Sequence, residues 1–420
     1  MFMQCIADFH IHSRYAYATS QTMNLPMLAL WAKFKGIEII GTGDFTHPLW
    51  QAELYEYLQE SEPGLFTLKK KYADLVQDQC FSTCAHVHQR FILSTEISLM
   101  FKRNGVSRKL HVLVLAPSFE VVEKISQALG HIGNIVSDGR PILSLDVIDF
   151  MHIVFDISPE CMVIPAHIWT PHFGALGSKS GFNSMQDCFG EMEQYIFAFE
   201  KGLSSSFVMN GQLSQLDRYT IIANSDAHSL QNLGREANLL DLSEYSYAAI
   251  TNALKRTSTI EKYISGIEFF PERGKYFGNG HRACNVYATF EQTQDYKGVC
   301  PVCKKKLTIG VYDRVAQLAD RTVEQACGYV KPARSILPLL DIIAFVLNVQ
   351  TTAKKVNIIY MNMLATIGPE FYILLHASFD HLAMHSSKEI AQAICAIRQG
   401  QVQVAPGYDG VYGKIEIINL

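Results

Sequence analysis

Short runs of β-branched and aromatic residues alternate with amphipathic stretches through the first 265 residues. Each run is followed by a polar loop and then by a stretch whose apolar positions recur every three or four residues, as in a helix. Strands and helices that alternate in this way predict an α/β protein built on a barrel or a doubly wound sheet. The seven expected strands are 6–9, 37–41, 91–95, 110–115, 162–166, 196–199 and 219–223.

A hairpin signal predicts how two of these strands pair. Asn104-Gly105 favours a two-residue turn, which would pair positions whose numbers sum to 209 and so place Glu96 opposite Leu113. His111 is two residues from Leu113 and would therefore lie on the same face as Glu96, as its diagonal neighbour. We expect the two side chains to act at one site.

Capping residues predict where individual helices begin and end. Asn24 can accept hydrogen bonds from the first amides of a helix that Gly36 would terminate. Near the end of the chain, Ser386 and Glu389 have the spacing of a capping box. The stretch from 269 to 316 is rich in Gly, Lys and Arg, and the pattern beyond it is helical. We therefore expect three domains: 1–268, 269–316 and 317–420.

Composition is that of a globular protein. Of the 420 residues, 48% are hydrophobic and 18% are charged, which argues against a disordered or fibrous chain. The net charge of -4 provides no global basic field for nucleic acid, although it says nothing of local patches. The N-terminus lacks the pattern of a signal peptide, and no apolar run approaches the ~20 residues of a membrane span. We expect a cytoplasmic protein without a membrane partner.

Histidines and carboxylates gather at the predicted strand ends. Eleven of the fifteen histidines precede residue 230, and the spacing of His10 and His12 directs both imidazoles to one face. Barrel enzymes build their active sites at the C-terminal ends of strands. Mixed imidazole and carboxylate ligands predict two or three divalent ions, of Zn, Mn, Fe or Mg. The nine candidate ligands are His10, His12, Asp44, His47, Glu96, His111, His167, Asp226 and His228.

A second metal motif lies in the middle stretch. Its four nitrogen and sulfur ligands are enough for a closed structural zinc site; a degraded site is the alternative. A run of lysines follows directly, and it suits either a solvated surface or contact with phosphates. The zinc candidates are His281, Cys284, Cys300 and Cys303, and the run is Lys304, Lys305 and Lys306.

Three further features are candidate nucleic-acid contacts, with ordinary surface loops as the alternative. One is a short polar loop that could cradle a phosphate, and another is an arginine whose planar fork could clamp one. The third is a glycine-flanked pair of tyrosines, whose rings could stack on a base. The residues are Ser178, Lys179 and Ser180 in the loop, then Arg235, and then Tyr408 and Tyr412.

These motifs resemble those of a known family. The His10-Ile11-His12-Ser13 run, Glu96 and the 224–228 segment are similar to the PHP family, which comprises polymerase and histidinol phosphatase domains. More narrowly, the segments 41–48, 177–182, 223–229, 233–238 and 406–410 resemble endonuclease Q, a DNA-repair nuclease of archaea and some bacteria. The resemblance implies a distorted seven-stranded (β/α) barrel followed by a small zinc ribbon and a helical C-terminal domain.

The resemblance also groups the candidate ligands. His10, His12, Glu96 and Asp226 would hold one ion, and Glu96 would bridge to a second ion held by His111 and His167. Asp44, His47 and His228 would hold the third. Of these residues, Asp226, His228 and Glu96 are the ones expected to act directly in catalysis.

The implied activity is that of a metal-dependent endodeoxyribonuclease in DNA repair, associated with the nucleoid. It would cleave 5′ to hypoxanthine, uracil, xanthine or an abasic site, and its partner would be DNA that carries such damage. Two alternatives stay open. A PHP-type phosphatase would use the same ligands on small phosphate monoesters, and a catalytically inactive adaptor would bind DNA without cutting it.

Overall fold

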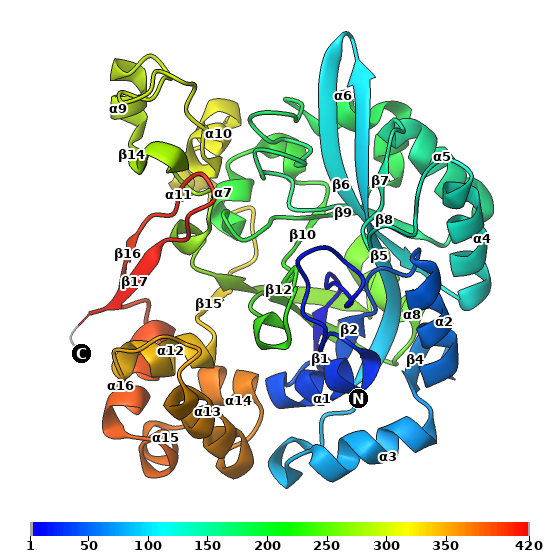
Figure 1. Ribbon diagram of the computed structural model, residues 1–420, viewed down its shortest axis with the longest axis vertical. Helices are drawn as coiled ribbons and strands as arrows, with labels where there is room; N and C mark the ends of the chain where they lie inside the picture. The colour runs from blue at the N-terminus through cyan, green and yellow to red at the C-terminus, as the bar shows by residue number, and fades with distance from the viewer. Residues whose placement is uncertain (1–2, 419–420) are drawn as a thin grey trace.

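The computed structural model describes residues 3–418 and is built around one large mixed sheet of 11 strands (Figure 1). Five of the seven expected strands belong to this sheet, and the other two, β9 (Ala198–Glu200) and β10 (Thr220–Ile222), pair with each other in parallel. The strands of the large sheet are β1 (Met3–Asp8), β2 (Ile39–Gly41), β3 (Leu58–Glu62), β4 (Leu65–Leu68), β5 (Arg90–Arg103), β6 (Val106–Ala116), β7 (Ile142–Leu143), β8 (Met162–Pro165), β11 (Ala237–Leu242), β12 (Lys262–Phe269) and β15 (Arg334–Ile336).

The sheet is mixed and open. β1, β2 and β5 run parallel, β6 returns antiparallel beside β5, and β8 pairs with β6. On its other side, β1 pairs antiparallel with β11. Within residues 3–418 no backbone ladder joins β8 to β9 or β10 to β11. A few hydrogen bonds span each gap. Glu200 accepts from the Ile168 N–H at its backbone oxygen (3.0 Å) and from the His167 N–H at Oε1 (3.3 Å), and the Asn238 side chain donates to Ala223 O (2.8 Å) and accepts from Ala223 N–H (3.0 Å). The α/β fold class is confirmed, and the expected barrel is not present as a closed sheet.

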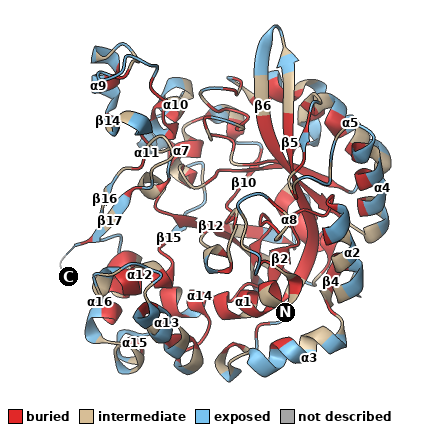
Figure 2. Ribbon diagram, in the orientation of Figure 1, coloured by how far each residue is buried: buried red, intermediate tan, exposed pale blue. Residues whose placement is uncertain are grey.

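The hairpin of β5 and β6 has the predicted turn and register. Asn104 and Gly105 have φ angles of 53° and 77°, the left-handed pair that a type I′ turn needs. Glu96 pairs with Leu113, as the sum rule predicted. The base of the hairpin is buried, whereas its tip projects from the molecule and is exposed (Figure 2).

The first eight helices lie in the same part of the chain as the sheet. They are α1 (Leu25–Lys35), α2 (Pro48–Tyr57), α3 (Lys70–Gln79), α4 (Phe119–Gly130), α5 (Val147–Ile157), α6 (Met185–Phe189), α7 (Phe207–Gly211) and α8 (Tyr247–Lys255). Of these, α1, α2, α3, α4 and α8 contact strands of the sheet. Asn24 caps α1, since its Oδ1 accepts from Met27 N–H (3.1 Å), and Gly36 ends the helix with a φ of 86°. Both predicted ends of this helix are therefore confirmed.

The middle stretch forms a small unit around Ala288, Cys300 and Leu307. Its elements are β13 (Asn279–His281), β14 (Val286–Ala288) and α9 (Phe290–Asp295), and α10 (Val311–Leu318) and α11 (Val323–Ala326) follow it and contact α7. β13 and β14 pair antiparallel. The loop between the last two strands of the chain returns to this unit, where Gly278 N–H donates to Gly407 O (2.8 Å).

The remaining elements are helical except for a final hairpin. They are α12 (Leu339–Val346), α13 (Lys354–Thr366), α14 (Glu370–Leu375), α15 (Phe379–His385), α16 (Lys388–Arg398), β16 (Val402–Ala405) and β17 (Lys414–Ile417). A buried ion pair, Lys35 Nζ to Glu370 Oε2 (2.7 Å), joins the helical part to α1. The predicted capping box is wrong by one residue: Ser387 caps α16, while the Ser386 hydroxyl donates to Leu382 O at the end of α15. Among residues 3–418, no helix has the length and hydropathy needed to cross a bilayer.

Candidate metal centre

His10 and His12 leave the end of β1 fully buried, and carboxylates orient both rings. His10 Nδ1 donates to Glu200 Oε2 and His12 Nδ1 donates to Asp44 Oδ1, each at 2.9 Å. A carboxylate bound to one ring nitrogen fixes the tautomer and leaves the other nitrogen free as a ligand. The two Nε2 atoms are buried and have no hydrogen-bond partner within the described chain. Both imidazoles are thus prepared for metal coordination.

Glu96 stands between two groups of imidazoles. Its Oε2 lies 3.5 Å from His10 Nε2 and 3.3 Å from His12 Nε2. Its Oε1 lies 2.7 Å from His111 Nδ1 and 3.0 Å from His167 Nε2. The hairpin register explains the position of His111, which is the diagonal neighbour of Glu96 on β6. Each carboxylate oxygen therefore has its own pair of nitrogen neighbours, which is the arrangement of a bridging ligand.

Asp226 completes the first group from the loop after β10. Its Oδ1 lies 3.2 Å from His12 Nε2 and 3.8 Å from His10 Nε2. The residue has a φ of 46°, a left-handed conformation that Asp and Asn tolerate better than most residues. Ligand atoms within 4.8 Å of one another form two sets, His10 with His12, Glu96 and Asp226, and Glu96 with His111 and His167.

The chemistry of both sets fits bound cations. His10 Nε2, His12 Nε2, Asp226 Oδ1 and His167 Nδ1 are buried without hydrogen-bond partners in residues 3–418, an arrangement that is costly unless another group neutralises it. Burial lowers the pKa of His111 to about 4, so that its ring is neutral, the form that binds metal. Burial alone would raise the pKa of Glu96, yet His111, His10 and Arg140 outweigh it and hold that pKa well below its usual value.

The third expected group is not gathered. Asp44 uses its two oxygens on His12 and on the Ser13 amide (2.6 Å). His47 Nε2 donates to Val136 O (2.9 Å), and His228 Nδ1 donates to the backbone carbonyl of Asp226 (3.0 Å). Across residues 3–418, Asp44, His47 and His228 do not form a set of ligand atoms within 4.8 Å. Asp44 instead orients a ligand of the first set.

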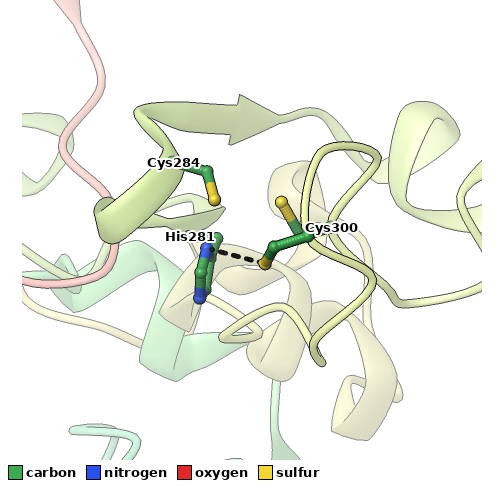
Figure 3. A group of neighbouring side chains, drawn as sticks. His281, Cys284 and Cys300 are labelled. Carbon is green, nitrogen blue, oxygen red and sulfur yellow. Dashed lines mark hydrogen bonds between the residues drawn. The ribbon is translucent and has the colours of Figure 1, made fainter.

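The zinc candidates come together as predicted by their spacing. Ligand atoms of His281, Cys284, Cys300 and Cys303 lie within 4.8 Å of one another. Figure 3 shows how the side chains of His281, Cys284 and Cys300 face one another. His281 Nδ1 lies 3.6 Å from Cys303 Sγ. Burial would raise the pKa of Cys300, but the amides of Cys303 and Val302 outweigh it and lower that pKa, which favours a thiolate. Lys304, Lys305 and Lys306 follow as an exposed run.

Two of the candidate nucleic-acid contacts are engaged within the protein. The Ser178 hydroxyl donates to Ile309 O (2.8 Å) and the Ser180 hydroxyl to Lys109 O (3.1 Å), while Lys179 is exposed. The fork of Arg235 donates to the backbone carbonyls of Ser225 (2.7 Å) and Asp226 (3.2 Å). Arg235 therefore positions the Asp226 loop, and the two serines fasten their own loop.

The two tyrosines differ in their surroundings. Tyr408 donates through its hydroxyl to Asn285 Oδ1 (2.8 Å), on the unit that holds the zinc candidates. Tyr412 is 46% exposed and lines a cavity of about 480 Å³. His111, His167 and Asp226 line the same cavity. Of the pair, Tyr412 is the ring placed to meet a molecule bound beside the ligand sets.

The sequence did not single out two residues of this site. Glu200, at the end of β9, orients His10 and also accepts from the His167 amide (3.3 Å). Arg140, in the loop before β7, donates through Nη1 to Glu96 Oε2 (3.1 Å). Glu200 has a detectable signal, because it directly follows the expected strand 196–199, whereas nothing in the local pattern around Arg140 points to Glu96.

Comparisons with known proteins found similar sequences and structures. Residues 338–401 match the family described as the MJ0043 C-terminal domain. The uncharacterized protein MJ0043 of Methanocaldococcus jannaschii is 29% identical over 241 residues, which are 56% of this chain and 30% of the length of that relative. The uncharacterized protein YqxK of Bacillus subtilis is 28% identical over 420 residues and 98% of both chains.

Two solved structures share the fold along the whole chain. The lesion-specific endonuclease PfuEndoQ of Pyrococcus furiosus has a TM-score of 0.83 at 27% identity and covers 99% of this chain and 96% of its own. An endonuclease Q in complex with a 27-mer duplex substrate with an abasic lesion at the active site has a TM-score of 0.85 at 27% identity, covering 99% and 97%. With this fold and two sets of metal-ligating side chains, the chain is similar to endonuclease Q along its whole length.

Proposed function

We propose that the protein is a metal-dependent DNA endonuclease of DNA repair, which hydrolyses a phosphodiester bond beside a damaged base. The observation that carries the proposal is the similarity, over 99% of the chain, to an endonuclease Q bound to duplex DNA with an abasic lesion. The two ligand sets that share Glu96 supply the groups that a metal-dependent hydrolase needs. Cleavage would fall on the 5′ side of hypoxanthine, uracil, xanthine or an abasic site.

The proposed ions lie in the two sets, with Zn, Mn, Fe or Mg as the candidates and Asp44, His47 and His228 as a proposed third site. Divalent ions at such sites activate water and neutralise charge on phosphate oxygens. The chain's own residues orient these ligands, with Glu200 and Asp44 holding the rings of His10 and His12. His228 is about a quarter exposed, and burial lowers its pKa. Its neutral ring is the form that would bind the proposed third ion.

We assign a role to each part of the chain. Residues 1–268 would be the catalytic domain, a PHP barrel whose gaps are spanned by individual hydrogen bonds. Residues 269–316 would be a zinc ribbon whose exposed lysines contact phosphates, and residues 317–420 would recognise DNA or the lesion. Tyr412, on the loop that returns from the C-terminal hairpin, lines the cavity beside the ligand sets and would stack on an extruded base.

An end-labelled duplex assay tests the function. Duplexes with a single deoxyinosine, deoxyuridine or abasic site, and an undamaged duplex, are incubated with the protein in Mg²⁺ or Mn²⁺. A parallel reaction contains a chelator in place of the metal. We expect one nick 5′ to each lesion, which chelation abolishes. The variant Asp226→Asn should lose the nick while folding normally, since Asn is also tolerated at the φ of 46° found there. Asp149→Asn, on an exposed turn of α5, is the control.

The same assay separates the alternatives. Metal-loaded protein that nicks none of the duplexes would overturn the endonuclease. Metal-dependent turnover of a phosphate monoester would then support the phosphatase, and lesion binding without cleavage would support the inactive adaptor.

Glu200→Gln is expected to weaken metal binding by about 10-fold to 100-fold, the usual cost of losing a carboxylate that orients a ligand histidine. The amide accepts from His10 less strongly than the carboxylate does and no longer fixes the ring at 2.9 Å. Chelator competition with Mn²⁺ or Zn²⁺ measures the effect. Glu191→Gln, at an exposed position, serves as the control. An unchanged affinity would show that His10 does not depend on Glu200.

His281→Ala is expected to lower the content of tightly bound zinc by one ion per chain. The variant leaves three thiols where the four ligand atoms now lie within 4.8 Å, and a structural zinc site needs four ligands. His281→Cys should retain the ion. Elemental analysis after dialysis against a weak chelator measures both, with the exposed His86→Ala as control. Full zinc in the alanine variant would argue against His281 as a ligand.

A further inference from the structure

Four lysines and arginines line the cavity beside the ligand sets, and they differ in how far their donors are used. They are Arg140, Lys201, Arg235 and Lys275. Lys201 is fully buried and bonds to carbonyls and to Glu236. Arg235 uses two of its donors, on Nε and Nη2, to hold two backbone carbonyls. Lys275 lies over the ring of its neighbour Tyr276, with Nζ 5.6 Å from the centroid.

Arg140 uses few of its N–H donors within the described residues. A guanidinium offers five N–H donors in a planar fork, and in residues 3–418 its side chain makes one hydrogen bond, from Nη1 to Glu96 Oε2 (3.1 Å). The side chain is 24% exposed and lines the cavity. Its remaining donors can therefore reach a molecule that enters there. The planar fork also matches two oxygens of a phosphate.

The backbone around Arg140 is held firmly. Its amide donates to Asp138 Oδ1 (3.0 Å), and Pro141 O accepts from the Ser98 amide on β5 (3.0 Å), two residues beyond Glu96. Gly139 packs so closely that a Cβ there would lie 2.5 Å from Asp44 Oδ2. The guanidinium is thus delivered to the ligand sets from a fixed segment, and little ordering entropy is lost when it binds a ligand.

Glu96 is the sole anionic side chain within 4.0 Å of the Arg140 guanidinium across residues 3–418. The same carboxylate faces four imidazoles. Cations bound at the two sets would neutralise Glu96 and weaken its hold on Arg140. The arginine would then be a positive fork directed at the cavity, at the edge of a centre that binds a phosphodiester.

We propose that Arg140 binds the non-bridging oxygens of the scissile phosphodiester and stabilises the negative charge that grows on them during cleavage. The proposal rests on the proposed function, because it takes the cavity to be the place where DNA is cut. It also assigns to Arg140 the phosphate contact that the sequence suggested for Arg235. Arg235 remains a positioning residue for the Asp226 loop.

The test compares Arg140→Gln and Arg140→Lys with wild type in three measurements. These are the metal-to-protein ratio, the single-turnover cleavage rate on an abasic duplex, and the salt dependence of binding to that duplex in Ca²⁺. Arg14→Gln is the matched control. Arg14 is close in sequence to the ligand His12, but its Nη2 donates to Glu53 on α2 (2.5 Å). The control should match wild type in all three.

For Arg140→Gln we expect a cleavage rate about 100-fold lower, the usual effect of losing one donor to a developing oxyanion. Metal content should be unchanged. The slope of log affinity against log salt is negative, and it should become less steep by about 0.9, the value for one phosphate contact. Arg140→Lys should regain the salt slope but only part of the rate, because lysine supplies charge without the fork.

The contrary outcomes are distinct. Cleavage by Arg140→Gln within about threefold of wild type, with an unchanged salt slope, overturns the proposal. A parallel loss of metal and activity also overturns it, since Arg140 would then serve only to hold Glu96. If wild type binds the duplex without cutting it, the proposed function fails, while the salt slope still decides whether Arg140 contacts phosphate. If wild type does not bind the duplex, both proposals fail.

Discussion

Glutamine in place of Glu96 is expected to lower lesion cleavage by about 10³-fold or more, beyond the cost of one lost oxyanion donor. The carboxylate offers one oxygen to His10 and His12 and the other to His111 and His167. An amide has a single acceptor oxygen and two N–H donors, so it can serve one set at most. Elemental analysis should therefore show loss of metal together with activity.

Glu38→Gln is the matched control for this variant. Burial raises the pKa of Glu38 to about 7, and its Oε2 accepts from Ile6 N–H (2.8 Å), a role that a neutral amide can also fill. We expect wild-type metal content and cleavage. A Glu96→Gln protein that retained its metal and cut within tenfold of wild type would contradict the bridging role.

Methionine in place of Lys201 is expected to destabilise the protein by about 3–5 kcal/mol near pH 8, because it leaves buried carboxylates without their cation. The Lys201 and Glu236 side chains are both fully buried and paired, and Glu268 Oε2 lies 3.7 Å from the ammonium. Urea denaturation of wild type and variant measures the difference. The double variant Lys201→Met with Glu236→Gln should recover part of the loss, since the unpaired charge is gone.

The effect should depend on pH in a defined direction. Burial raises the pKa of Glu236 from 4.5 to about 7, so the folded protein holds this proton more tightly than the unfolded chain. The stability that this proton contributes is present below pH 4.5 and is lost as pH rises through about 7. Removing Lys201 makes the ionised form still less favourable. The deficit of the variant should therefore grow from about pH 5.5 to about pH 8, and a deficit that shrinks over this range would contradict the assignment.

Local chemistry made part of this structure predictable. The Asn104-Gly105 turn has few alternatives, and it fixed the partner of Glu96 correctly. The Asn24 cap and Gly36 were read correctly for the same reason, because each depends on neighbours within one helical turn. The prediction that Ser386 caps α16 was wrong, because two adjacent serines could each cap that helix. Ser386 bonds to the end of the preceding helix, and Ser387 is the cap.

Long-range contacts were the part that spacing could not supply. Arg140 bonds to a residue 44 positions away, and no periodic pattern connects a loop arginine to a particular strand carboxylate. The opposite case is Arg235, whose residue type suggested a phosphate contact, whereas the structure uses its Nε and Nη2 to hold the backbone carbonyls of Ser225 and Asp226. Sequence reveals which side chains can do chemistry, and the tertiary fold decides which remain free to do it.

The β5–β6 hairpin has a consequence for how proteins with this fold can diversify. Its base carries Glu96 and His111, while its tip projects into solvent (Figure 1). Adding or removing one residue on each strand would change the reach of this arm and leave the pairing at its base untouched, whereas an unmatched residue would have to be absorbed as a bulge. Evolution can therefore alter the length of the arm in matched steps, and with it the surface presented to a substrate, without disturbing the catalytic centre.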